Sequence, residues 1–185
     1  MKEIEVKIRL PDVCAVPKLV SHLKTLNARQ VGVTRERNHI FDLENRFLKG
    51  KGCMLRVREG LIGSPSSITF KGPAEESLLS KVKVREEVET EIQNPQAIIR
   101  LLRNLGLEVK CTYAKIRQTY ELCGAMVQID EVAGLGYFVE IEDSDERKIK
   151  ELIRVCRLER FERITKSYPD MVEENSGSKA FRTDL

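Results

Sequence analysis

Residues 3–7 read EIEVK, a stretch in which charged and apolar side chains alternate one by one. Because successive side chains of a β-strand point to opposite faces, the three charged residues would share one face and the two apolar residues the other. The same alternation recurs in LRVRE at 55–59, KIRQTY at 115–120 and GYFVEIED at 136–143. One such strand is typical of a half-solvated antiparallel sheet, but four strands with paired like charges indicate a bound ligand.

The composition is highly charged but nearly balanced. The chain has 185 residues, of which 32 are Lys or Arg and 29 are Asp or Glu, giving a formal net charge of +3. This length fits a single domain that buries roughly 70% of its unfolded surface. Because the charges nearly cancel, a nonspecific nucleic-acid binder with one basic face is disfavoured, and we expect a small, polyvalent partner instead.

The cysteine and histidine content bears on compartment and metal chemistry. Five cysteines form an odd set without a C-x-x-C motif, and no basic and apolar leader precedes the first strand. These features favour a reduced, cytoplasmic protein. No apolar run approaches the about 18 residues that span a bilayer, so no membrane association is expected. With only His22 and His39 present, any metal would be held by carboxylates rather than by imidazoles.

Alternation and turn residues predict eight strands and three helices. The strands are expected over 2–10, 29–42, 53–60, 66–72, 81–92, 108–122, 125–132 and 136–143. The helices are expected over 12–27, 95–105 and about 144–157, the second with Asn94 as its cap and Pro95 in its first position. The segment after Met171 has little apolar content and is expected to be flexible.

Eight antiparallel strands can close into a barrel, whose two faces then have different surroundings. Small barrels are commonly filled with apolar side chains, and on that interpretation the charged face is solvated. The amphipathic helices favour the opposite arrangement, because they require an apolar outer sheet surface to cover. That surface would be formed by Ile4, Val6, Ile8, Leu55, Val57, Ile68, Phe70, Val82, Val84, Val88, Val127, Ile129, Val139 and Ile141. Periodicity alone leaves both arrangements open.

EIEVK resembles the E-x-E-x-K signature of the CYTH superfamily, the triphosphate tunnel metalloenzymes. Further similar motifs follow in order: NHIFD at 38–42, LRVRE at 55–59, TFKGP at 69–73, REEVE at 85–89, KIRQTY at 115–120, VQIDE at 127–131 and FVEIED at 138–143. The KGP turn and the SYPDM segment look most like the class IV adenylyl cyclases of this superfamily. Asn38 and Ile40 depart from the pattern, since many members have Asp and Tyr there.

The resemblance implies an α+β fold with an eight-stranded antiparallel closed β-barrel. Its interior would be a polar tunnel open at both ends, with the helices packed outside. The likeness covers about residues 1–172, which we expect to form one domain followed by a flexible tail over 173–185.

The resemblance also implies a site for a triphosphate and for Mg²⁺ or Mn²⁺. Arginine forks and lysine point charges suit phosphate oxygens, and the expected substrate-binding residues are Arg56, Arg58, Lys71, Arg85, Lys115 and Arg117. Hard divalent metals prefer oxygen ligands, and the expected metal ligands are Glu3, Glu5, Asp130, Glu140 and Glu142. Glu87 and Glu89 could instead pair with the arginines. In the resembling hydrolases the signature lysine, here Lys7, is a candidate base for the attacking water, and surrounding cations could lower its pKa.

Three functions are compatible with these residues. The first is hydrolysis of a triphosphate with a divalent metal, and the second is cyclisation of ATP to cyclic AMP and pyrophosphate, as in class IV adenylyl cyclases. The third is a noncatalytic module that binds polyphosphate or nucleotide through the same cations. An RNA-binding barrel is disfavoured, because the chain has no Trp, four Tyr and six Phe with which to stack bases. The oligomeric state is left open.

Overall fold

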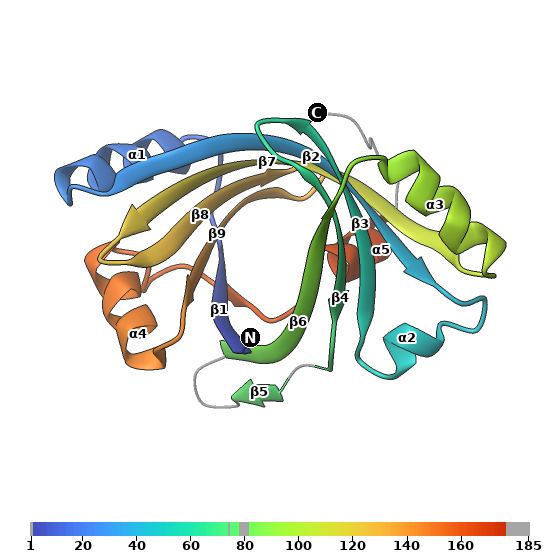
Figure 1. Ribbon diagram of the computed structural model, residues 1–185. Coiled ribbons are helices and arrows are strands. Elements are labelled where there is room, and N and C mark those ends of the chain that lie inside the picture. The colour runs from blue at the N-terminus through green and yellow to red at the C-terminus, as the bar shows by residue number, and fades with distance from the viewer. Residues whose placement is uncertain (1, 74, 78–81, 177–185) are drawn as a thin grey trace.

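The computed structural model describes residues 2–73, 75–77 and 82–176. In this part of the chain the fold is α+β, with ten antiparallel strands in one strongly curved sheet and five helices (Figure 1). The fold class and the antiparallel pairing are as predicted.

Eight long strands form the body of the sheet and match the predicted strands to within two residues at each end. They are β1 (Lys2–Arg9), β2 (Arg29–Asp42), β3 (Met54–Ile62), β4 (Ser66–Lys71), β6 (Val82–Ile92), β7 (Glu108–Leu122), β8 (Ala125–Val132) and β9 (Gly136–Asp143). Two short strands within the described residues were not predicted, β5 (Glu75–Ser77) and β10 (Arg163–Ile164). Lys81, the predicted start of the fifth strand, lies outside the described residues.

The first strand has partners on both of its sides. The strand order is β10-β1-β9-β8-β7-β2-β3-β4-β6-β5, with an additional pairing between β1 and β6. Residues 4–9 of β1 register against β9, and residues 2–5 register against β6. The sheet therefore curves around an interior, into which Figure 1 looks.

Three of the five described helices correspond to the predicted ones: α1 (Ala15–Thr25), α3 (Pro95–Asn104) and α4 (Glu146–Val155). The predicted cap of α3 is present, because the Asn94 side chain accepts a hydrogen bond from the Ala97 amide at 2.9 Å. The single turn α2 (Phe47–Gly50) and the C-terminal α5 (Tyr168–Ser176) were not predicted. No helix of the described segments is long and apolar enough to cross a membrane.

The expected boundary at residue 172 falls inside α5. Glu173, which was assigned to the flexible tail, lies in this helix and pairs with Arg46 at 2.6 Å and with Lys49 at 2.8 Å. Residues 177–185 of the expected tail lie outside the described residues.

The helices cover the apolar face of the sheet. The largest core cluster packs α1 and α4 onto strand residues that include Val6, Ile8, Val127 and Ile141. A second cluster packs α3 onto the β2–β3 wall. Phe70 and Val88, which are paired across β4 and β6, belong to the predicted apolar series but stay exposed at 41% and 61%. The side chains of Val82 and Val84 lie outside the described part of the structure. The charged face therefore lines the interior, as the amphipathic helices indicated.

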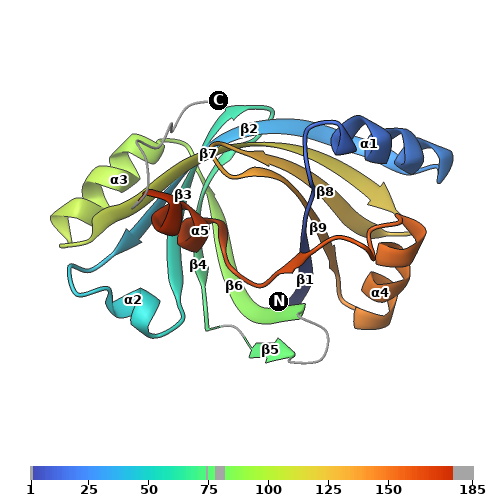
Figure 2. The same cartoon turned by 180° about the vertical axis from the view of Figure 1, so that it is seen from behind.

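One end of the interior is apolar rather than charged. Ile40, Tyr113 and Phe138 pack there with Tyr168 and Met171 of α5 in a buried cluster. α5 lies at the opening that faces the viewer in Figure 2. The expected passage open at both ends is therefore filled at the α5 end, because apolar side chains replace charged ones there on β2 and β7.

Candidate active site

The charged interior contains a cavity of about 300 Å³. Its walls come from seven of the long strands, all but β2, and its floor from the residues that begin α5. Every predicted substrate-binding residue lines it: Arg56, Arg58, Lys71, Arg85, Lys115 and Arg117. Lys7, Glu5, Glu140 and Glu142 line the same cavity. The alternating pattern of the sequence thus brings together side chains that lie more than 130 residues apart.

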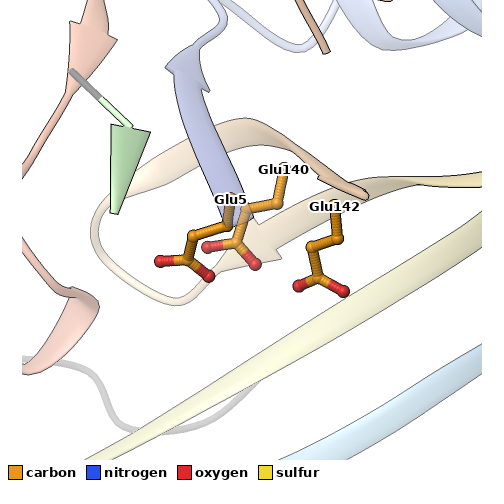
Figure 3. A group of neighbouring side chains, drawn as sticks. All are labelled: Glu5, Glu140 and Glu142. Atoms are coloured by element: carbon orange, nitrogen blue, oxygen red, sulfur yellow. The ribbon is translucent and has the colours of Figure 1, made fainter. Parts of the chain in front are cut away.

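Three carboxylates meet on one wall of the cavity (Figure 3). Glu5 lies on β1 opposite Glu142 of β9, and Glu140 lies two residues before Glu142. One carboxylate oxygen from each of the three lies within 4.8 Å of the others. Because like charges this close repel unless a cation compensates them, and because hard divalent metals prefer oxygen ligands, these residues fit Mg²⁺ or Mn²⁺. We refer to Glu5, Glu140 and Glu142 as the acidic triad.

Two cations hold the Glu140 carboxylate of the acidic triad. Its Oε1 lies 3.2 Å from Lys7 Nζ, and its Oε2 accepts a hydrogen bond from Arg117 Nη2. Burial alone would raise the pKa of Glu140, but the charges of Lys7, Arg117 and Lys115 outweigh it and hold the pKa well below its usual range. The group is therefore ionised at neutral pH, as a metal ligand must be.

The structure places Asp130 differently from the prediction, which grouped it with the metal ligands. Asp130 is fully buried and is not among the residues that line the cavity. It accepts hydrogen bonds from Arg117 Nε at 2.7 Å and Nη2 at 2.6 Å, and from Tyr168 OH at 2.8 Å. Lys115 Nζ lies 3.3 Å from the same carboxylate. Asp130 therefore anchors cations from behind the wall, because it sits directly across from Arg117 in the β7–β8 register.

Glu3 can be placed by its backbone alone. It lies on β1 in register with Arg85 of β6, two residues before Glu5 and so on the same face of the strand. Its side chain lies outside the described part of the structure, and its role as a metal ligand stays a prediction.

The wall formed by β3, β4 and β6 carries acids and bases side by side, and it adjoins the acidic triad through Arg85, whose Nη2 lies 4.0 Å from Glu5 Oε1. Glu89 pairs with Arg56 at 3.3 Å and with Arg58 at 3.0 Å. Glu87 pairs with Lys71 and, at 3.3 Å, with Arg85. Both carboxylates thus pair with cations. Pairing with the arginines, instead of metal binding, was the alternative given for Glu87 and Glu89 in the sequence analysis. Burial and the neighbouring Arg56 and Arg85 charges lower the pKa of Lys71.

A second layer of polar residues was missed by sequence reasoning. Glu36 of β2 is buried beneath the cations, with Lys115 Nζ at 3.5 Å and Arg58 Nε at 3.8 Å. Asn38, where many family members have Asp, is fully buried and donates to Glu36 Oε1 at 3.1 Å. The alternation of β2 could have indicated both residues, since Glu36 and Asn38 share the inward face of this strand.

Gln128 was also missed. This buried residue of β8 lines the cavity and donates a hydrogen bond from Nε2 to Glu142 Oε2 at 3.0 Å. Its Oε1 has no hydrogen-bond partner among the described residues. It thus orients one member of the acidic triad from the neighbouring strand.

Glu36→Gln should make stability less sensitive to acid. Burial raises the pKa of Glu36, but Lys115, Arg56, Arg117 and Arg58 lower it further, to about 2 from an ordinary 4.5. A carboxyl group with a depressed folded pKa stabilises the fold above its unfolded pKa, and this contribution is lost as pH falls from 4.5 toward 2. We expect wild type to exceed the variant by roughly 3 kcal/mol in unfolding free energy at pH 7, with the gap narrowing below pH 4.5. Urea unfolding at several pH values measures this gap, and a gap independent of pH would contradict the assignment.

A CYTH domain matches residues 1–168, so the chain belongs to the CYTH domain family. This confirms the resemblance inferred from the ordered motifs. The chain is 26% identical over 180 residues to "Putative adenylate cyclase MJ0240" of Methanocaldococcus jannaschii, covering 92% of this chain and 98% of that protein.

Solved structures share the fold along nearly their whole length. The PH1012 protein from Pyrococcus horikoshii OT3 matches with a TM-score of 0.77 at 25% identity, covering 92% of this chain and 99% of that one. A Hippeastrum protein, HpAC1, described as a putative adenylyl cyclase with a dominant triphosphatase activity, matches with a TM-score of 0.75 at 22% identity. In that comparison 94% of this chain and 96% of the Hippeastrum chain are covered.

Proposed function

We propose that the protein is a divalent-metal-dependent enzyme that hydrolyses a phosphoanhydride bond of a triphosphate, either inorganic tripolyphosphate or an organic triphosphate. One observation carries this proposal: a single cavity joins the acidic triad to seven Lys and Arg side chains. Membership of the CYTH domain family and the triphosphatase activity stated for HpAC1 support it.

We further infer that the eight long strands act as one closed tunnel around the cavity. The pairing of β1 with both β9 and β6 supports this inference. A ring of strands would hold the acidic triad and the cations at fixed separations, and such preorganisation is what electrostatic catalysis requires.

The roles of the residues follow from their positions. The acidic triad would hold the metal, which when bound supplies charge neutralisation at the phosphate oxygens and at the leaving group. The arginines and lysines of the cavity would bind phosphate oxygens and exchange contacts with Glu87 and Glu89 for contacts with substrate. Lys7 lies 3.2 Å from Glu140 and acts on it as a cation, so its ammonium group would orient the attacking water or a phosphate oxygen rather than take up a proton.

Cyclisation of ATP is the second candidate, and the name given to MJ0240 favours it. This reaction additionally requires the ribose 3′-hydroxyl to lie in line with the α-phosphorus, an orientation worth several powers of ten in rate. The ionic lining of the cavity is suited to the phosphates that both reactions share, and hydrolysis requires little beyond it. The third candidate, a noncatalytic module, would bind the same ligand without turnover.

Product analysis separates the three candidates. The purified protein is incubated with Mg²⁺ or Mn²⁺ and either tripolyphosphate or ATP, and the products are resolved by ion-exchange chromatography. Orthophosphate release that depends on the metal supports hydrolysis. Cyclic AMP with stoichiometric pyrophosphate from ATP would establish cyclisation instead, and binding without any product would leave the noncatalytic module.

Arg58→Ala should weaken triphosphate binding without removing the metal. Arg58 lines the cavity and pairs with Glu89 at 3.0 Å, so its loss removes one charge-assisted contact to the triphosphate of about 2 kcal/mol, or roughly a thirtyfold rise in Kd. Isothermal titration with tripolyphosphate measures the change. Arg37→Ala is the matched control, because Arg37 neighbours Asn38 on β2 but faces outward toward Glu59. Equal tripolyphosphate affinities of the Arg58 variant and wild type would show that Arg58 does not bind the triphosphate.

A further inference from the structure

Tyr168 joins the C-terminal helix to the cavity. It is the first residue of α5 and comes from the SYPDM segment at 167–171. It is 5% exposed, and it lies among the residues that line the cavity. Its ring packs edge-on against Phe138, with centroids 5.2 Å apart, and lies 6.1 Å from the Tyr113 ring. These contacts leave the side chain little freedom to move.

The hydroxyl group of Tyr168 reaches the anchor of Arg117. It donates a hydrogen bond to Asp130 Oδ2 at 2.8 Å, and the same oxygen accepts from Arg117 Nη2 at 2.6 Å. Burial, together with the Asp130 and Glu140 charges, raises the pKa of Tyr168 well above its usual value, so the phenol stays a neutral donor. The hydroxyl thus helps to fix the carboxylate that holds Arg117 by two parallel hydrogen bonds.

The ring of Tyr168 lies beneath two lysines of the cavity. Lys7 Nζ is 4.1 Å from the ring centroid and Lys115 Nζ is 5.4 Å from it. Both distances are within the range of a cation–π contact. The backbone just before α5 also contributes, because Lys166 O accepts a hydrogen bond from Lys7 Nζ at 3.3 Å. One residue of α5 therefore contacts Lys7 and Lys115 directly and Arg117 through Asp130.

We propose that Tyr168 is a positioning residue, whose hydroxyl orients Arg117 through Asp130 and whose ring orients Lys7 and Lys115 toward a bound triphosphate. This inference rests on the proposed function, since it assigns α5 a part in the same site. The two halves of the side chain have separable effects. The hydroxyl acts on a phosphate-binding arginine and should govern affinity, whereas the ring also supports Lys7 and should govern turnover as well.

A purely structural role would have a different signature. α5 is also docked by Lys49 of α2, which pairs with Asp170 at 3.0 Å and with Glu173 at 2.8 Å. Lys49 is not among the residues that line the charged cavity. Lys49→Met therefore loosens α5 without touching the site, and it serves as the matched control.

The test compares Tyr168→Phe, Tyr168→Leu and Lys49→Met with wild type. Binding of tripolyphosphate is measured calorimetrically in EDTA, where no turnover occurs, and kcat and KM are measured with Mg²⁺. Thermal melting reports stability. Tyr168→Phe should raise Kd and KM roughly tenfold, the scale of one hydrogen bond to a charged group, with kcat little changed. Tyr168→Leu should also lower kcat, and Lys49→Met should lower the melting temperature while leaving Kd unchanged.

Wild-type Kd, KM and kcat in Tyr168→Phe would overturn the inference. So would an equal rise in Kd for Lys49→Met, because the effect would then come from helix docking. Tyr168→Phe retains the ring and its packing, so it decides the question even where Tyr168→Leu fails to fold. If wild type binds tripolyphosphate but does not hydrolyse it, the proposed function fails while the binding comparison still tests Tyr168.

Discussion

Replacing Glu140 with glutamine should lower metal-dependent triphosphate hydrolysis by roughly a thousandfold, the upper end of the range for losing one group that stabilises transition-state charge. Glu140 belongs to the acidic triad and at the same time contacts Lys7 and Arg117. A neutral amide of the same shape would weaken metal binding and leave both cations without their carboxylate partner. Initial rates with Mg²⁺ and Mn²⁺, together with calorimetric titration of Mn²⁺, measure both effects.

The matched control for this variant is Glu146→Gln. Glu146 lies at the start of α4 on the outside of the sheet and pairs with Lys150 at 2.8 Å. Its replacement should leave rates and metal affinity unchanged. Near-normal turnover and normal Mn²⁺ affinity in Glu140→Gln would exclude the acidic triad as the metal site.

Asp130→Asn should lower stability strongly but spare the metal. Asp130 is fully buried against Arg117, Lys115 and Tyr168. Removing one partner of a buried ion pair costs about 3–5 kcal/mol, because the remaining charges lose their compensation. Urea unfolding at pH 7 measures this loss, and Mn²⁺ titration without substrate should give the wild-type affinity.

Glu121→Gln provides the comparison for Asp130→Asn. Glu121 pairs with Arg29 near the end of β7, where the two side chains are 34% and 69% exposed. Such a surface pair contributes less than about 1 kcal/mol. A large loss of Mn²⁺ affinity in Asp130→Asn would indicate that Asp130 is a metal ligand. It would contradict the role of Asp130 as a buried anchor for Arg117 and Lys115.

Strand alternation was sufficient to predict much of the cavity lining. Glu5, Lys7 and Glu140 lie on one face of their strands by parity, and this parity does not change when the sheet curves. The amphipathic helices then indicated which face is outside, since Leu19, Leu23 and Ile149 require the apolar surface they cover. The long strands and their helices were therefore predictable from local pattern.

Parity gives the face of the strand on which a side chain lies but not how deeply it is buried, and Asp130 shows this limit. Gln128 and Asp130 share a face of β8, yet Gln128 lines the cavity while Asp130 is sealed behind Arg117. Which of the two meets a ligand depends on the residue opposite each in the next strand. That register is a tertiary property.

The C-terminal helix could not be predicted from periodicity. α5 carries Pro169 in its first turn, and its buried residues Tyr168 and Met171 contact strands that are distant in sequence. A hint was present in Ile40, an apolar residue at a position of β2 where many family members have Tyr. Its place in the apolar cluster beside α5 shows where the charged lining ends.

The most direct test of the account is diffraction from crystals that contain Mn²⁺ and a nonhydrolysable imidotriphosphate. We predict an anomalous manganese peak bound by Glu5, Glu140 and Glu142, with the phosphates lying in the cavity against Arg56 and Arg117. A manganese peak away from the acidic triad, or a triphosphate bound outside the charged cavity, would contradict the central claim that these residues form one metal and triphosphate site.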